Sequence, residues 1–198
     1  MKLVDDTTRI AAIVIAGQGS RAGLIDDQIL PSLTGFDEVL VVGTHHGGNG
    51  FRYLHVPDLT KTTNDALVKR DVGALATDCS ILVYLADDHR VRDGFAAELR
   101  AFAREKVVPW DVLIPARWVQ HPEQGLLRIP NGEENYYCAG HGGVFRRRVI
   151  VARPWTAQQH HRNWDLISSH DHLRAGFKLL AYPKLQIEDL EPMAEPWK

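Results

Sequence analysis

Two adjacent carboxylates, Asp87 and Asp88, follow the most apolar run of the chain, Ser80–Leu85. A strand buried on both faces cannot carry two neighbouring charges, so we expect the pair in the loop at its end. Adjacent carboxylates raise each other's pKa, and a divalent cation relieves their repulsion. Mg²⁺ is typically held by one or two carboxylates together with substrate phosphates. The pair therefore predicts a metal and phosphate site. The simpler alternative is that the two acids only end the strand and Asp88 caps the next helix.

A glycine-containing loop with the sequence Ala-Gly-Gln-Gly-Ser-Arg, residues 16–21, follows the first apolar run, Arg9–Ile15. Loops of this composition let a nucleotide approach the backbone closely, although the pattern alone does not identify a family. No acid follows the next apolar run, Glu38–Val42, where a dinucleotide site would hold a ribose. We therefore expect Ala16 and Gly17 to contact a base or ribose.

The elements that must position these loops alternate along the first half of the chain. Strands are predicted at 9–15, 38–42, 52–56, 80–85 and 111–114, and helices at 64–77, capped by Thr63, and around 95–103. This alternation predicts a Rossmann-type α/β domain with a mainly parallel sheet flanked by helices. Ligands bind outside the carboxyl ends of such strands, which places residues 17–21, 44–50 and 86–90 on one rim.

The second half has a different pattern from Arg117 onward, rich in Pro, Gly, aromatic and polar residues. A helix is expected near 164–175, and short strands at 178–182 and 186–187. No linker or repeat separates the halves, so residues 1–198 are expected to form a single domain.

The acidic pair and its surroundings resemble the metal motif of GT-A-fold nucleotide-sugar glycosyltransferases, which is often written Asp-X-Asp. Here the triplet is Ala86-Asp87-Asp88, and the last acid would be the metal ligand. Upstream, Arg70–Gly73 is similar to the Arg-Asn-X-Gly segment of that family, with Asp71 in place of Asn. Downstream, Gly142–Arg147 resembles a glycine-containing segment that ends in Phe-Arg-Arg.

A fourth segment, Asn163-Trp164-Asp165, lies eleven residues before Gly176, counted from the Asp, and resembles the Trp-Glu-Asp region of the family. The Asp of that region is the catalytic base of inverting members, which here would be Asp165. Trp164 would remove water from that carboxylate and raise its pKa toward a useful range for a base. Asp171 is the alternative base. The resemblance covers roughly residues 9–190.

The resemblance implies inverting transfer of a sugar from a UDP- or GDP-type nucleotide-diphosphate sugar to an acceptor hydroxyl, assisted by Mn²⁺ or Mg²⁺. Residues 1–116 would bind the donor and residues 117–198 the acceptor. Metal ligands would come from Asp88, with Asp87, Glu188 and Asp189 as further candidates. The donor would contact Ala16, Gly17, Arg70, Asp87, Gly142 and Gly143. The aromatic residues expected at the acceptor are Trp118, Tyr136, Tyr137 and Trp164.

Two other functions remain open. A sugar nucleotidylyltransferase shares the nucleotide-binding half of this architecture and has a similar glycine loop. A catalytically inactive binding module is the other alternative, because Ala86 replaces the first acid of the metal motif. A soluble acceptor is favoured over a modified nucleic-acid base.

The composition fits an enzyme of this kind. The chain has 198 residues, 44% of them hydrophobic, and a formal net charge of −2, which gives no overall attraction to nucleic acid or anionic lipid. Its two cysteines do not form a disulfide or zinc pattern. No signal core and no apolar stretch long enough to span a membrane is found, so a cytoplasmic location is expected.

Overall fold

A computed structural model describes residues 8–17, 21–44, 51–58, 63–105, 108–121, 125–129, 142–157 and 171–190 of the chain. Its first half is a parallel sheet around strand β1 (Ile10–Ala16), in which all seven residues are buried. Strand β2 (Glu38–Gly43) pairs with one edge of β1 and β4 (Ile81–Ala86) with the other, and β3 (Arg52–His55) pairs with β2. The strands predicted at 9–15, 38–42, 52–56 and 80–85 are confirmed to within two residues at each end.

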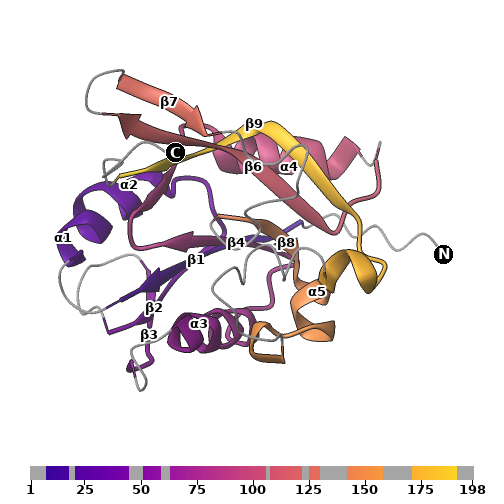
Figure 1. The fold of residues 1–198 in the computed structure, drawn as a ribbon, viewed down its shortest axis with the longest axis horizontal. Helices are drawn as coiled ribbons and strands as arrows, with labels where there is room; N and C mark the ends of the chain where they lie inside the picture. The colour runs from indigo at the N-terminus through magenta and orange to yellow at the C-terminus, as the bar shows by residue number, and fades with distance from the viewer. Residues whose placement is uncertain are drawn as a thin grey trace.

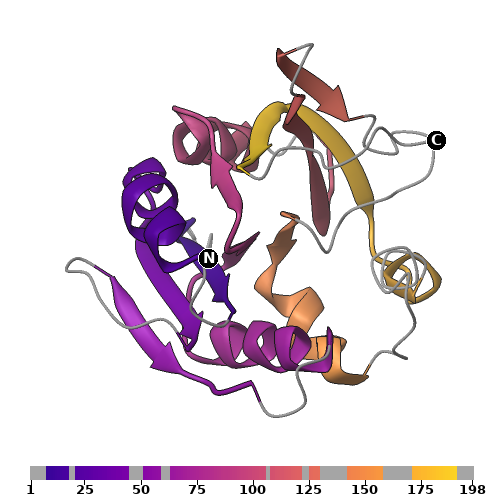
Figure 2. The same ribbon diagram turned by 60° about the vertical axis from the view of Figure 1, so that its left-hand side comes forward.

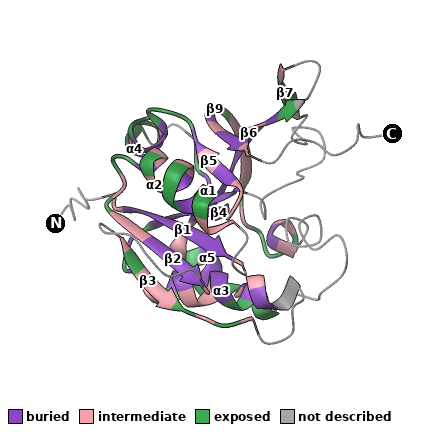
Figure 3. Ribbon diagram, turned by 90° about the vertical axis from the view of Figure 1, so that its left-hand side faces the viewer, coloured by how far each residue is buried: buried purple, intermediate pink, exposed green. Residues whose placement is uncertain are grey.

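The core forms on both faces of these strands (Figure 3). Side chains alternate along β1, so Ile10, Ala12 and Val14 face one cluster while Ala11, Ile13 and Ile15 face the other. The first cluster is covered by α4 (Phe95–Glu105) and by a short helical segment, α1 (Ala22–Leu24), η1 (Ile25–Ile29) and α2 (Leu30–Ser32). The second is covered by α3 (Thr63–Leu75), α5 (Arg147–Ala152) and η2 (Trp155–Ala157). Helices therefore cover both faces of the sheet, and α3 and α5 lie side by side on one of them (Figure 1).

One glycine explains how closely α3 packs on the sheet. A Cβ atom added to Gly73 would lie 2.5 Å from Cγ2 of Ile13. Because real Cβ atoms do not approach carbon so closely, only glycine fits at this position unless the helix moves away from β1.

The second half of the chain adds strands to the same sheet in both directions. Strand β8 (Val144–Arg146) runs antiparallel to β4 and to β6 (Val112–His121). Strand β9 (Leu179–Asp189) runs parallel to β6 and antiparallel to β5 (His89–Val91), while β7 (Gly125–Ile129) pairs antiparallel with β6. The curved yellow β9 lies along β6 in Figure 2.

The α/β class is confirmed, but the predicted mainly parallel sheet must be corrected to a mixed one. Strand order among the described residues is β3-β2-β1-β4-β8-β6-β9-β5, with β7 on β6. The two short strands predicted at 178–182 and 186–187 are one strand, β9, and the strand predicted at 111–114 continues to His121. The physical reason is that β7 follows β6 after three residues, too few for the crossover that parallel pairing needs, and that β8 enters antiparallel between β4 and β6.

No helix among the described residues has the length and apolar character that crossing a bilayer would require.

Candidate active site

The end of β1 and the end of β4 meet at one rim of the sheet, as predicted. These strands are parallel neighbours, with Ile15 opposite Ala86. The residues that follow them are therefore adjacent, and the backbone N–H of Gly17 donates to Oδ2 of Asp87 at 3.0 Å. Asp87 and Asp88 form a turn that leads directly into β5. Since a strand follows, the alternative in which Asp88 caps a helix is wrong.

A residue not selected from the sequence, Arg21, binds both acids. Its Nη1 atom donates to Oδ1 of Asp87 at 2.8 Å and to Oδ2 of Asp88 at 3.1 Å. Arg21 immediately precedes α1 and ends the glycine loop. The sequence feature that could have identified it is a positive charge at the end of a loop expected to bind a nucleotide. One guanidinium therefore bridges the two carboxylates.

The C-terminal acidic pair reaches the same rim through the pairing of β5 with β9. His89 lies opposite Asp189 in this register, and the backbone N–H of Leu190 donates to the carbonyl oxygen of Asp88 at 2.7 Å. The Nε2 atom of the buried His89 lies 3.0 Å from Oδ1 of Asp189 and 3.5 Å from Oδ1 of Asp88. Residues a hundred positions apart in the sequence thus meet around one imidazole.

Asp189 is held as an anion by this arrangement. Arg117 on β6 donates from Nε at 2.8 Å and from Nη2 at 2.6 Å, one bond to each carboxylate oxygen. Burial raises the pKa of Asp189, but the hydrogen bonds and positive charges of His89 and Arg117 outweigh it and lower the pKa to about 2. The carboxylate is therefore ionised at any physiological pH.

One carboxylate oxygen of this site differs from the others in its hydrogen bonding. Oδ1 of Asp88 is buried and has no hydrogen-bond partner among the described residues. Its contact with His89 at 3.5 Å is beyond the length of a good hydrogen bond. A buried carboxylate oxygen without a donor is costly, and an oxygen-binding cation is one partner that removes the cost.

Glu188 faces away from these groups because neighbouring residues of a strand point to opposite sides. Its carboxylate is paired with Arg90 at 2.7 Å and with Arg92 at 2.9 Å. Of the two C-terminal acids considered as metal ligands, the structure brings Asp189 to the turn that holds Asp88, and it does not bring Glu188 there.

Solved structures support the architecture around this site, although no protein-family model and no curated protein matches the sequence. GalNAc-T7 with UDP, GalNAc and Mn²⁺ superposes with a TM-score of 0.63 at 11% identity, over 96% of this chain and 45% of that one. The protein A197 from STIV superposes with a TM-score of 0.55 at 13% identity, over 90% of this chain and 84% of that one. The chain has a GT-A-like fold. It spans less than half the length of GalNAc-T7.

Within this GT-A-like fold, the predicted phosphate residue Arg70 is almost completely buried on α3. Its guanidinium carbon lies 5.5 Å from the ring centroid of Trp155, within the range of a cation–π contact. The neighbouring Asp71 accepts hydrogen bonds from the backbone of Trp155 and from Thr156. Asp71 therefore holds η2 against α3.

Lys69 reaches the end of β1 and was missed in the sequence because it lies beside the more conspicuous Arg70. Its Nζ donates to the carbonyl oxygen of Ala16 at 2.8 Å and forms an ion pair with Asp58. Lys69 is 1% exposed, so it holds the chain at Ala16 in place rather than meeting solvent.

Gly142 and Gly143 lie beside the end of β4. The carbonyl oxygen of Gly143 accepts the N–H of Tyr84 at 3.1 Å. Gly142 has a φ of +96°, and a Cβ atom there would lie 2.6 Å from Cδ1 of Ile187. Gly142 therefore lets the chain pass closely beside Ile187 of β9.

The predicted base and acceptor residues fall partly outside the described part of the chain, namely Asp165, Trp164, Tyr136 and Tyr137. Asp171 lies in a helical turn at 171–174 and forms a 3.8 Å ion pair with Arg174. Trp118 on β6 lies opposite Glu188, with the guanidinium carbon of Arg92 5.9 Å from its ring centroid. Trp118 is therefore on the strand face of Glu188, opposite to the face of Asp189.

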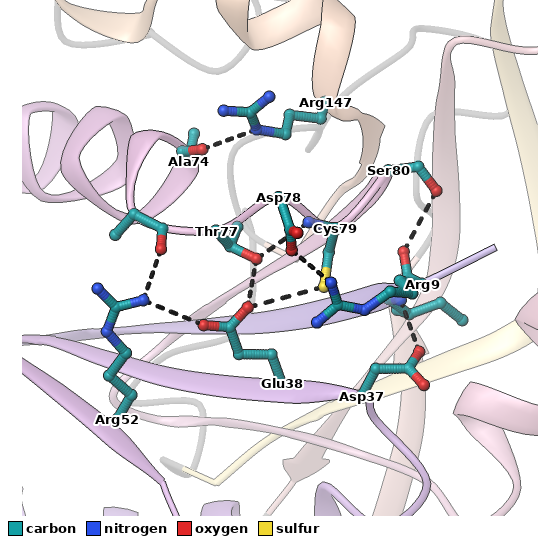
Figure 4. A network of polar contacts seen from close by, with 12 residues as sticks. Arg9, Asp37, Glu38, Arg52, Ala74, Thr77, Asp78, Cys79, Ser80 and Arg147 are labelled. Carbon is teal, nitrogen blue, oxygen red and sulfur yellow. Dashed lines mark hydrogen bonds and ion pairs between the residues drawn. The ribbon is translucent and has the colours of Figure 1, made fainter. Parts of the chain in front are cut away.

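A second acidic group lies at the far end of the sheet, where the parallel strands begin (Figure 4). Among the described residues, Glu38, Asp78 and Cys79 form a set whose potential ligand atoms all lie within 4.8 Å of one another. Glu38 accepts hydrogen bonds from Thr77 at 2.5 Å and from the Cys79 thiol at 3.8 Å, and Asp78 pairs with Arg9. Burial raises the pKa of Cys79, which favours the thiol over the metal-binding thiolate. This group is a satisfied hydrogen-bond network.

Proposed function

We propose that the chain transfers a sugar from a nucleotide-diphosphate sugar to an acceptor hydroxyl, with a divalent cation held at Asp88. The observation that carries the proposal is the buried Oδ1 of Asp88, which has no hydrogen-bond partner among the described residues. It lies on the rim where ligands of parallel α/β sheets bind. The similarity in fold to a protein solved with UDP, GalNAc and Mn²⁺ supports the choice of ligands.

The residues present suit a hard cation. Asp88 supplies an oxygen ligand. Asp189 stays ionised beside it, but both of its oxygens are engaged by Arg117 and His89, so it supports the cation as a nearby negative charge. Both oxygens of Asp87 are engaged, by Gly17 and by Arg21. Asp87 therefore holds the loop in position and supports the cation indirectly. When bound, Mn²⁺ or Mg²⁺ would neutralise the leaving diphosphate.

The remaining roles follow the same geometry. Ala16 and Gly17 would contact the nucleotide, since Lys69 and Asp87 fix this loop from two sides. Gly142 and Gly143 would let the donor lie close to the backbone beside β4. Transfer with inversion needs one carboxylate to take the acceptor proton, for which we propose Asp165, with Asp171 as the alternative.

The proposed division into a donor part up to residue 116 and an acceptor part from residue 117 falls inside β6. That strand pairs with β8 near Val112 and Leu113 and with β7 beyond Arg117. The two functions would therefore be carried by one continuous sheet, with the acceptor reaching the rim from the side of β7 and β9.

The test is a calorimetric titration with UDP and with GDP, in the presence and absence of Mn²⁺. Mn²⁺ should strengthen binding of one nucleotide at least about tenfold, which corresponds to about 1.4 kcal/mol. Asp88→Ala should abolish this enhancement and keep its melting temperature, because a carboxylate at the rim does not hold the core.

The matched control is Asp78→Ala, which removes an acid from the group at the other end of the sheet. It should keep the full enhancement. Metal-independent binding of both nucleotides by the wild type would refute the proposal, and so would loss of the enhancement in Asp78→Ala alone.

A further inference from the structure

The contact between Arg21 and the acidic turn combines two features. One atom, Nη1, lies within 3.1 Å of a carboxylate oxygen of each acid, so a single positive group sits between two negative ones. Both carboxylates are largely buried, with side chains 16% and 20% exposed, whereas the Arg21 side chain is 33% exposed. The guanidinium side chain is therefore the most exposed of the three charged groups.

Two adjacent, largely buried carboxylates need a counter-charge whenever no metal is present. A divalent cation and the guanidinium would both supply this charge, and a cation that binds Oδ2 of Asp88 as well as the unpartnered Oδ1 would compete with Arg21 for Oδ2. Asp87 also accepts the N–H of Gly17, so it keeps a partner if the guanidinium leaves. Asp88 gains a stronger partner if a cation binds both of its oxygens.

We infer that Arg21 is the internal counter-ion of Asp87 and Asp88, that a divalent cation displaces it, and that the released guanidinium binds the diphosphate of the donor. This inference rests on the proposed function, since it concerns the same metal and the same leaving group. Guanidinium forms paired hydrogen bonds with phosphate oxygens, and a diphosphate bound to a cation at Asp88 lies within reach of a side chain that previously touched Asp88.

The exchange couples the two ligands. A metal that binds alone must break the contacts of Arg21 with the two acids, and this cost lowers the affinity for the metal. Nucleotide binding gives Arg21 a new anionic partner, which restores the lost interaction. The site is thereby biased toward binding metal and nucleotide diphosphate together, and against holding the metal alone.

The experiment uses the full chain with Arg21→Gln, which removes the charge and keeps a polar side chain of similar reach. Mn²⁺ is titrated alone, and then UDP and GDP are titrated at saturating Mn²⁺. Arg21→Gln should bind Mn²⁺ alone about tenfold more tightly and should bind the nucleotide about tenfold more weakly. Arg21→Lys keeps the charge without the paired donors, so its Mn²⁺ affinity should stay near the wild-type value while nucleotide binding weakens.

The matched control is Arg100→Gln. Arg100 forms an ion pair of the same length, 2.8 Å, with Asp37, which hydrogen-bonds the opposite end of β1 through Ile10. This variant should leave both affinities unchanged, and melting temperatures of all variants report on folding.

Weaker Mn²⁺ binding in Arg21→Gln would show that Arg21 only shapes the acidic turn, and would overturn the inference. Unchanged affinities would overturn it as well, while the proposed function stands if the wild type binds Mn²⁺ and nucleotide together. If neither the wild type nor Arg21→Gln binds Mn²⁺, the metal-dependent function and this inference both fall.

Discussion

The ion pairs of Asp189 lead to a prediction about stability and pH. Its pKa is lowered from an ordinary value of 3.8 to about 2, against the opposing effect of burial, by His89 and Arg117. A shift of one unit corresponds to about 1.4 kcal/mol, so a shift of nearly two units means that the ionised carboxylate stabilises the folded chain by about 2 kcal/mol. Asp189→Asn should lower the free energy of unfolding by about this amount.

The sign of the pH dependence follows from the direction of the shift. Because the pKa is lower in the folded chain than in the unfolded chain, the stabilisation is complete above about pH 5 and is lost as the pH falls through 4 toward 2. The stability difference between the wild type and Asp189→Asn should therefore shrink by about half between pH 5 and pH 3.

The assay is urea unfolding of both proteins at pH 5 and pH 3, with a chelator present so that no metal binds at the acidic turn. Asp78→Asn serves as the control, because the Asp78 side chain is 80% exposed and its ion pair with Arg9 should contribute little. A difference between wild type and Asp189→Asn that is equal at both pH values would refute the reasoning, since it would show that the charge of Asp189 is not what stabilises the rim.

Further substitutions test other parts of the molecule. Gly73→Ala should lower the free energy of unfolding by about 1–3 kcal/mol because its new Cβ would meet Ile13, and a stability equal to the wild type would show that α3 shifts freely. Arg70→Lys should weaken nucleotide binding if the Arg70 guanidinium binds the diphosphate through paired hydrogen bonds. Equal nucleotide affinities of Arg70→Lys and the wild type would show that Arg70 only packs in the core. Asp165→Asn should reduce sugar transfer by ~10²–10⁴-fold with the melting temperature unchanged. If Asp165→Asn keeps its activity and Asp171→Asn loses it, Asp171 is the catalytic base.

The acidic turn could be predicted from local sequence because the physical constraint is local. A run as apolar as that of β4 must be buried, and two charges directly after it must reach the surface at its end. The same reasoning placed the end of β1 beside it, since consecutive strands joined by helices run parallel and share one rim. Gly17 and Asp87 are in contact for this reason.

The direction and pairing of the later strands depended on the tertiary structure. A strand's own residues determine that it is buried, but not which neighbour it pairs with or in which direction. Strand β8 enters antiparallel between β4 and β6, which makes the sheet mixed. The register of β5 with β9 then places Asp189, rather than Glu188, beside His89, because a change of one residue reverses the face of every side chain.

The partners of the acids were likewise decided by the fold. Arg21 lies 67 residues from Asp88, and Arg117 lies 72 residues from Asp189, so no short window of sequence shows that they meet. That a pair of carboxylates lies at the rim of an α/β sheet follows from the residues of β4 and the turn after it. Which cations compensate those charges depends on distances between segments that the chain brings together only when it folds.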